Sequence, residues 1–407
     1  MSQRSFLMPA VDDPDRQQIL ARMYRAKQRP VCPCKDPGAE MYIAKIGGDN
    51  YIVKRMPDTG ALHSPDCSSY EPPPELSGLG DVLGSAIKEN ADSGLTELRF
   101  DFSMTRVPGR KPIGANTESG DSVKTDGSKL TLRGTLHYLW EEAGFNRWSL
   151  GMAEKRNWYV VRKHLLQAAG DKINKGLALD DQLFIPETFN VEKKDALKQH
   201  WLGLVARLVP KTAASPKRLM ILVGEVKEIV PARYGSQMVI KHAPDIRFFL
   251  PEDLHKKMEK RFADELTFHR DERLDIHLMS IATFSVNAAG TADIEELALM
   301  TVNNNWIPFE TIYDKALLDL LTEQNRRFTK GLRYNLPAAK PLASVVLSDT
   351  EPQPTAMYIL PPQPDEEYFP ALERLQSDSK LSPWTWNSIE FQIPDLPPAA
   401  NLSNQKD

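Results

Sequence analysis

All three cysteines of the chain lie within residues 32–67, and one histidine lies in the same stretch. Cys32 and Cys34 form one pair separated by a single residue, and His63 and Cys67 form a second pair separated by three. Thiolates and neutral imidazoles are preferred ligands of Zn²⁺, and four of them complete its tetrahedral coordination. The spacing therefore predicts a zinc site that holds the N-terminal part of the chain together.

A predicted hairpin explains why the two pairs lie far apart in the sequence. Residues 41–46 and 51–56 read as strands, and the turn sequence Gly-Gly-Asp-Asn lies between them at 47–50. An antiparallel hairpin returns the chain to where it began, so both pairs should meet at its open end. Four protein ligands leave no coordination position for water, so we expect a structural metal and not a catalytic one.

Two other interpretations of the cysteines stay open. The first treats Cys32 and Cys34 as ordinary buried thiols and His63 as a surface residue. The second treats Cys32 and Cys34 as a redox-active pair, although this assigns no role to His63 or Cys67.

The composition is that of an ordinary soluble protein, with 41% hydrophobic and 26% charged residues and a net charge of −4. A nucleic-acid surface would therefore have to be a local patch. We expect no membrane span, because no run of 18 apolar residues is present, and no secretory signal, so a cytoplasmic location is expected. The phosphate-binding and dinucleotide-binding glycine motifs are absent from the sequence, and no small-molecule substrate is predicted.

The predicted fold class is α+β with several domains: a small zinc-bound β-hairpin unit, a helical middle, a β-rich segment and a C-terminal α/β unit. The expected segments are 1–75 (helix and zinc-binding hairpin), 76–129 (strand and flexible linker), 130–210 (helical, a candidate helix-turn-helix), 218–305 (β-rich), 306–393 (α/β) and 394–407 (disordered tail).

A basic stretch with interleaved aromatic residues, 146–164, is the strongest candidate for nucleic-acid contact. Lysine and arginine can neutralise phosphates, and aromatic rings can stack on bases. The alternative is a basic helix face whose tryptophans lie in the core. The candidate residues are Arg147, Trp148, Lys155, Arg156, Trp158, Arg162 and Lys163.

The C-terminal order helix, strand, strand, helix resembles the restriction-endonuclease-like fold. That resemblance implies a carboxylate pair for a divalent metal, and Glu310 and Asp349 are its weak candidates. The Glu-x-Lys that should follow is missing, and the one on a strand, Glu225 with Lys227, precedes both. We therefore expect a binding or structural module more than an enzyme.

Several longer segments resemble an uncharacterised bacterial family, the domain-of-unknown-function family numbered eleven seventy-three. These are CPCKDPGAEMYIAKIGGDNYIVKRMPDTGALHSPDC, EPPPELSGLG, LWEEAGFNRW and FTKGLRY. The resemblance implies a plasmid or integrating-conjugative-element context, with DNA or a DNA-handling protein as partner. The leading hypothesis is a zinc-stabilised nucleic-acid-binding accessory protein of a mobile element. The alternatives are a metal-dependent nuclease and a protein-interaction scaffold.

Overall fold

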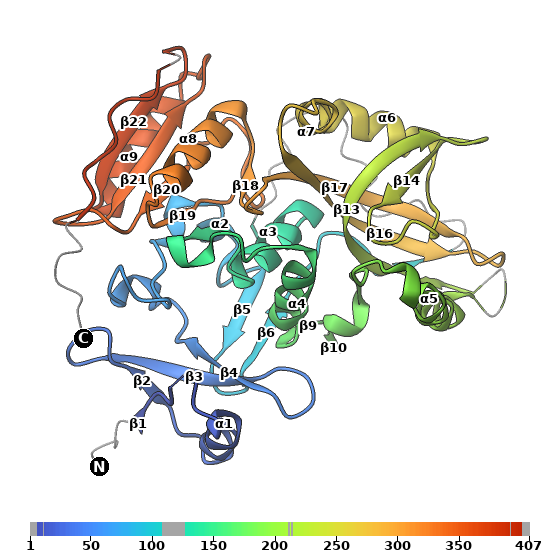
Figure 1. Cartoon of the computed structure of the whole chain (residues 1–407), viewed down its shortest axis with the longest axis horizontal. Helices are drawn as coiled ribbons and strands as arrows, with labels where there is room; N and C mark the ends of the chain where they lie inside the picture. Colours follow the sequence, from blue (N-terminus) through green and yellow to red (C-terminus); the bar gives the residue numbers. More distant parts are fainter. Residues whose placement is uncertain are drawn as a thin grey trace.

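The computed structural model of the chain describes residues 6–400 apart from 11, 108–126, 211, 213–214 and 391. Four parts are visible in Figure 1: an N-terminal sheet at the lower left, central helices, a strand-rich part on the right and a C-terminal sheet at the upper left. Most of the predicted linker lies outside the described residues.

The N-terminal part is a four-stranded sheet covered by helix α1, Arg16–Arg25. The predicted hairpin is confirmed, because Met41 pairs with Arg55 at one end and Lys45 with Tyr51 at the other. Gly47 and Gly48 take φ values of +52° and +55°, a left-handed conformation that glycine adopts without steric penalty. In sheet order the strands are β1 (Phe6–Leu7), β2 (Pro30–Cys32), β3 (Ala39–Lys45) and β4 (Tyr51–Arg55).

The middle of the chain combines helices with a small four-stranded sheet. The helical periodicity is confirmed by α3 (Leu132–Glu142), α4 (Trp158–Ala169) and α5 (Lys194–Leu208). The segment 76–129, for which a strand and a flexible linker are predicted, contains three short strands in its described part. The remaining elements here are α2 (Leu79–Val82), β5 (Ile87–Asn90), β6 (Leu95–Leu98), β7 (Thr105–Arg106), β9 (Lys172–Asn174), β10 (Leu177–Ala178) and β12 (Lys217–Arg218), with the sheet order β10-β9-β6-β5.

The β-rich segment closes into a five-stranded barrel. Its strands pair in the order β13-β14-β15-β17-β16, and β13 also pairs with β16, which completes the circle. All pairs are antiparallel except β15 with β17, which is parallel. Helices α6 and α7 lie between the third and fourth strands in sequence and cover the top of the barrel in Figure 1, while α5 lies below it. The bounds are β13 (Met220–Pro231), β14 (Ser236–Ile240), β15 (Phe248–Leu250), α6 (Glu252–Arg261), α7 (Ala263–Arg270), β16 (Ile276–Val286) and β17 (Ala292–Asn303), with β11 (Leu183–Phe184) beside β13 and β18 (Pro308–Phe309) beside β17.

The C-terminal part is a five-stranded sheet in the order β22-β21-β20-β19-β8. Its edge strand β8, Arg147–Trp148, comes from the helical middle and pairs with β19. The predicted helix, strand, strand, helix order is present, but a further strand follows the first helix directly and another follows the second helix. The bounds are α8 (Ile312–Glu323), β19 (Phe328–Lys330), β20 (Val345–Leu347), β21 (Thr355–Leu360), α9 (Tyr368–Ser379) and β22 (Ser382–Asn387).

The predicted segment boundaries do not coincide with separate cores. One continuous cluster of buried apolar side chains runs from Leu79 to Tyr334 and includes the helical middle and the barrel. Because β8 also crosses into the C-terminal sheet, the middle segment is shared between two cores. Because strands and helices of one segment pack against those of another, changes of composition along the chain do not mark the limits of its cores.

The expectation of a disordered tail from residue 394 is wrong for the described part. The backbone N–H of Ala400 donates to the Asp349 carbonyl at 2.7 Å, and Arg326 Nη1 donates to the Pro397 carbonyl at 2.7 Å. Leu396 packs on the C-terminal core. A proline-rich segment can lie extended on a surface because its backbone needs few internal hydrogen bonds. Residues 401–407 lie outside the described residues.

Candidate metal centre and predicted interface residues

The four predicted ligands meet at the open end of the hairpin. Cys32 ends β2, Cys34 lies in the turn before β3, and His63 and Cys67 lie in the loop after β4. Their ligand atoms all lie within 4.8 Å of one another. Among the described residues, this is the one group of three or more cysteine, histidine or acidic side chains with that spacing.

The distances between ligand atoms fit a tetrahedral metal. Zn–S bonds of about 2.3 Å and Zn–N bonds of about 2.0 Å place neighbouring ligand atoms roughly 3.5–3.8 Å apart. The Sγ atoms of Cys32 and Cys67 are 3.6 Å apart, and Nδ1 of His63 lies 3.3 Å from Cys34 Sγ and 3.7 Å from Cys67 Sγ. These separations are too long for a disulfide, which needs about 2.05 Å.

The surroundings of His63 and Cys34 favour the protonation states that bind metal, whereas burial raises the pKa of the Cys32 thiol to about 12. Burial lowers the pKa of His63, and the nearby cations Arg55 and Lys35 lower it further, which favours the neutral imidazole. Burial alone would raise the pKa of Cys34, but the N–H of Ser64 and the neighbouring thiols outweigh it and lower that pKa. The Ser64 N–H donates to Cys34 Sγ at 3.5 Å. The residues present therefore fit a metal ion bound by thiolates and one imidazole.

The loop that carries His63 and Cys67 is anchored to the rest of the protein by arginine. Arg147 Nη1 donates to the Ser68 carbonyl at 2.6 Å, and its Nη2 donates to Glu71 Oε1 at 2.7 Å. Arg55 on β4 pairs with the other oxygen of the same carboxylate. Since Arg147 belongs to β8, this contact joins the loop that carries His63 and Cys67 directly to the C-terminal sheet.

A second contact between the N-terminal sheet and the middle is a buried ring of four charges. Lys54 Nζ on β4 lies 2.8 Å from Glu142 Oε2 and 2.9 Å from Asp171 Oδ2. Lys172 Nζ lies 2.8 Å from the same Glu142 oxygen and 2.5 Å from Asp171 Oδ1. Burial alone would raise the pKa of Glu142, but Lys172 and Lys54 outweigh it and hold that pKa well below its ordinary value. We call these four residues the ion-pair ring.

Sequence reasoning missed the ion-pair ring, and no local signal would have found it. Lys54 is 88 residues from Glu142 and 117 from Asp171, so the contacts depend on how the hairpin docks. A lysine in a short strand reads as a solvent-facing residue. Only the arrangement of the sheet against α3 and β9 shows that this one is buried.

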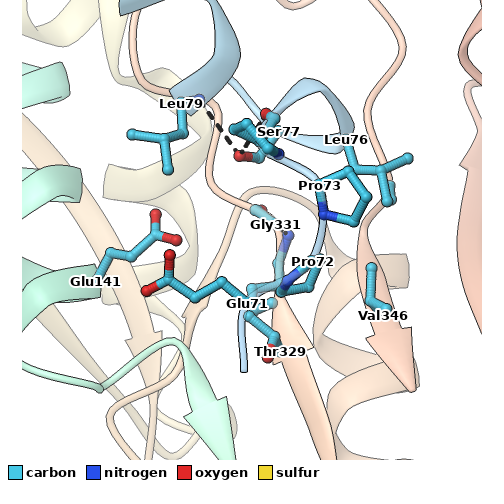
Figure 2. Close-up of a pocket in the computed structure, with 13 residues that line it drawn as sticks. Glu71, Pro72, Pro73, Leu76, Ser77, Leu79, Glu141, Thr329, Gly331 and Val346 are labelled. Carbon is cyan, nitrogen blue, oxygen red and sulfur yellow. Dashed lines mark hydrogen bonds between the residues drawn. The ribbon is translucent and has the colours of Figure 1, made fainter. Parts of the chain in front are cut away.

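A small cavity of about 20 Å³ lies where the proline-rich segment 72–74 meets β19. Figure 2 shows the carboxylates of Glu71 and Glu141 turned toward each other across it. This volume holds about one water molecule. Burial raises the pKa of Glu141 to about 7, and the charge of Glu71 adds to the rise. Tyr334 Oη donates to Glu141 Oε2 at 2.6 Å.

The raised pKa of Glu141 predicts a pH-dependent contribution to stability. Between the ordinary pKa of 4.5 and about 7, the folded chain binds more protons than the unfolded chain. The contribution of protonated Glu141 to the stability of the fold is therefore complete below pH 4.5 and is lost as the pH rises through about 7. Glu141→Gln should be more stable than the parent at about pH 8, with the difference shrinking toward about pH 5, as measured by urea unfolding. A constant difference across that range would contradict the assignment.

Most of the residues predicted to contact nucleic acid are buried or form hydrogen bonds within the protein. Trp148 and Trp158 are each 4% exposed. Arg156 donates to the backbone carbonyls of Phe145, Gly144 and Asn305, which places its guanidinium between two loops. These contacts favour the alternative that the stretch is largely structural.

The other members of that stretch do not complete one surface. Arg162 Nε donates to the Ile185 carbonyl at 2.9 Å, and Arg147 holds the metal-binding loop. Lys155 and Lys163 are the exposed members of the set. The candidate helix-turn-helix is also not formed, because β8 lies between α3 and α4 and pairs with β19.

The two weak nuclease candidates are already paired with arginine. Arg333 Nε lies 2.6 Å from Glu310 Oε2. Arg326 donates to both oxygens of Asp349 at 3.0 Å, and the N–H of Arg327 donates to it at 2.8 Å. A carboxylate held by a bidentate arginine is poorly available to a divalent metal.

Glu310 and Asp349 also lie at opposite ends of β20. The Glu310 N–H donates to Asp314, which in turn accepts a hydrogen bond from Ser344 just before the strand. Asp349 follows the end of the strand. The three-residue strand β20 lies between Ser344 and Asp349, and it alone spans roughly 10 Å at about 3.3 Å per residue. The structure does not bring the pair together as a two-carboxylate metal site.

The Glu-x-Lys on β13 does not supply the missing residues. Glu225 is buried and accepts hydrogen bonds from Lys241 Nζ at 2.7 Å and His277 Nδ1 at 2.8 Å. Lys227 is exposed, and its Nζ lies 3.8 Å from Glu228 Oε1. The carboxylate therefore pairs with other strands of the barrel and not with the Glu310 or Asp349 regions.

Within the described residues, no helix combines the length and the apolar character that crossing a membrane requires.

Comparisons with known proteins identify one family. No curated protein and no solved structure matches the chain. The model of the family described as "Protein of unknown function (DUF1173)" matches residues 7–389, nearly the whole chain. The chain therefore belongs to the DUF1173 family.

Proposed function

We propose that this chain is a zinc-stabilised nucleic-acid-binding protein, and that the closed barrel β13–β17 is its binding element. The supporting observation is the connectivity of that barrel: strands in the order first, second, third, fifth, fourth, with helices between the third and fourth. Small five-stranded Greek-key barrels bind oligonucleotides and oligosaccharides on the outer face of their second and third strands. In this chain those strands are β14 and β15.

The two loops that flank such a binding face are also present. Binding barrels of this kind use the loop between the first and second strands and the loop between the fourth and fifth. Here these are residues 232–235, between β13 and β14, and residues 287–291, between β16 and β17. The proposal thus moves nucleic-acid contact from the 146–164 stretch to the barrel.

Zinc is the metal that the donor set favours. Three thiolates with one imidazole suit a d¹⁰ ion in closed tetrahedral coordination, whereas magnesium and calcium prefer oxygen ligands. A bound Zn²⁺ would supply folding free energy and no catalysis, since the protein fills all four positions. Its ligands Cys32, Cys34, His63 and Cys67 would hold the hairpin and the following loop together.

Family membership fits a role beside DNA, if the plasmid and conjugative-element context of the family applies to this chain. We do not extend the proposal to a nuclease, because Glu310 and Asp349 are paired with arginine and lie apart. A protein-interaction scaffold remains the alternative if nucleic acid does not bind.

Direct titration tests the proposal. Fluorescence anisotropy with labelled mixed-sequence DNA and RNA should show saturable binding by the purified chain at about 50 mM salt and much weaker binding at about 200 mM. Counterion release predicts a linear fall of log affinity with log salt concentration. No anisotropy change up to about 100 μM protein, the weak limit of ordinary non-specific binding, would overturn the function and leave the scaffold.

A further inference from the structure

We propose that the nucleic acid is single-stranded and crosses the outer face of β14 and β15, with bases stacking on Tyr234 and Phe249 and phosphates contacting Arg233 and Arg247. This inference rests on the proposed function and names the surface and the class of partner. The four residues are called the barrel face below.

Strand register places Phe249 on the outside of the barrel. It pairs with Gln237 on β14, and Gln237 pairs with Val230 on β13. The neighbouring register pair, Met238 with Phe248, is fully buried inside. Because successive side chains of a strand point to opposite faces, the row of Phe249, Gln237 and Val230 points outward. All three are partly exposed.

Tyr234 stands at the rim of this row. It lies in the loop 232–235 and is 80% exposed, although a tyrosine ring carries a large apolar surface. Gly235 has φ +83°, and a Cβ added there would lie 2.2 Å from the Leu250 carbonyl oxygen. The loop therefore touches the end of β15, which holds Tyr234 close to the strand that carries Phe249.

The charges on the barrel face suit a phosphate backbone. The guanidinium of Arg233 lies 5.4 Å from the centre of the Tyr234 ring, so cation and ring form one platform. Arg247 is exposed and directly precedes β15, two residues before Phe249. Throughout the part of the chain that the structure describes, neither arginine takes part in an ion pair with an acidic side chain. Asp245, two residues before Arg247, is paired with Lys194, and Glu252, which follows β15, is paired with Lys256.

Unpaired strands are the form of nucleic acid that such a surface can hold. A base stacks on an aromatic side chain only when its own face is free, which a duplex prevents along its length. The strands of the face are short, five residues for β14 and three for β15. This suits the few nucleotides, about 4–16, that one barrel of this class covers. The two unpaired arginines favour a polyanion over an uncharged oligosaccharide.

The test uses the full chain and a labelled oligothymidylate of about 15 nucleotides, beside the same strand annealed to its complement. Tyr234→Ala should weaken single-strand binding about tenfold, and Phe249→Ala by a similar factor, because stacking contributes that much per base. Arg233→Gln with Arg247→Gln should reduce the slope of log affinity against log salt by about 1.4. Tyr159→Ala is the matched control, since this tyrosine is 66% exposed on α4 in the stretch first predicted to bind.

Each outcome of these titrations tests a different part of the two proposals. Unchanged binding in Tyr234→Ala, an exposed position whose replacement should leave the fold intact, would overturn the barrel face but not nucleic-acid binding by the chain. A loss in Tyr159→Ala instead would return the interface to α4. Preference for the duplex over the single strand would overturn the single-strand assignment. Absence of binding to any nucleic acid, or binding of an uncharged oligosaccharide alone, would overturn both proposals.

Discussion

Cys67→Ser should leave the purified chain without stoichiometric zinc and should unfold the N-terminal hairpin and the loop after it. Serine removes one of four ligands, and the three that remain cannot close the tetrahedral site. Structural zinc contributes about 10–16 kcal/mol of apparent binding free energy in small zinc-finger peptides, far more than a hairpin and one short helix gain by packing. Elemental analysis and hydrogen exchange over residues 30–71 measure the two effects.

The loss should spread beyond the metal site, because Arg147 donates to Ser68 and Glu71 in the same loop. Exchange should therefore also rise at β8, while the barrel strands stay protected. His63→Ala should behave like Cys67→Ser, and His200→Ala, at an exposed histidine on α5 paired with Glu187, is the matched control. Full zinc content in both ligand variants would contradict the assignment of the metal centre.

Glu142→Ala should lower the free energy of unfolding by about 3–5 kcal/mol. The substitution removes the partner that both Lys54 Nζ and Lys172 Nζ contact at 2.8 Å, and it leaves Asp171 alone against two cations. Lys172 has no exposed side-chain surface, so water cannot replace the lost carboxylate without local opening. Urea unfolding monitored by tryptophan fluorescence measures the difference.

Two further variants separate charge from packing in the ion-pair ring. Glu192→Ala, an exposed glutamate before α5, should change stability little because its charge is solvated in both states. Replacing all four members together, with Glu142→Leu, Asp171→Leu, Lys54→Met and Lys172→Met, should recover much of the loss, since apolar residues of similar size often replace a buried ionic cluster without penalty and no buried charge is left unpaired. An unchanged midpoint in Glu142→Ala would mean that the ring does not hold the hairpin against the middle.

Local sequence patterns predicted the elements that depend on neighbouring residues. The hairpin followed from alternation around Gly47 and Gly48, and the ligand set followed from two short cysteine and histidine spacings joined by that hairpin. Helices α3, α4 and α5 followed from periodicity. In each case the deciding interactions lie within a few turns or one strand pair, so the information is contiguous in the chain.

The basic aromatic stretch shows what a local sequence pattern leaves undecided. Arg147, Arg156 and Arg162 look like phosphate contacts in sequence, because an unpaired arginine is normally solvent-exposed. In the structure their guanidinium groups donate to backbone carbonyls of distant loops. The sequence shows that these arginines are hydrogen-bond donors, but the acceptor of each one depends on the tertiary arrangement.

The sequence by itself determined the hairpin, the clustering of the three cysteines with His63, the helices of the middle and the β-rich character of residues 218–305. Only the tertiary structure decided that those strands close into a barrel, that Phe249 faces outward and Phe248 inward, and that Lys54 is buried beside Glu142. The physical reason is the sequence separation between the residues that interact. Ligand spacing and helical periodicity are set by neighbours in the chain, whereas strand order, docking and ion-pair partners are set by contacts between residues that only the complete fold brings together.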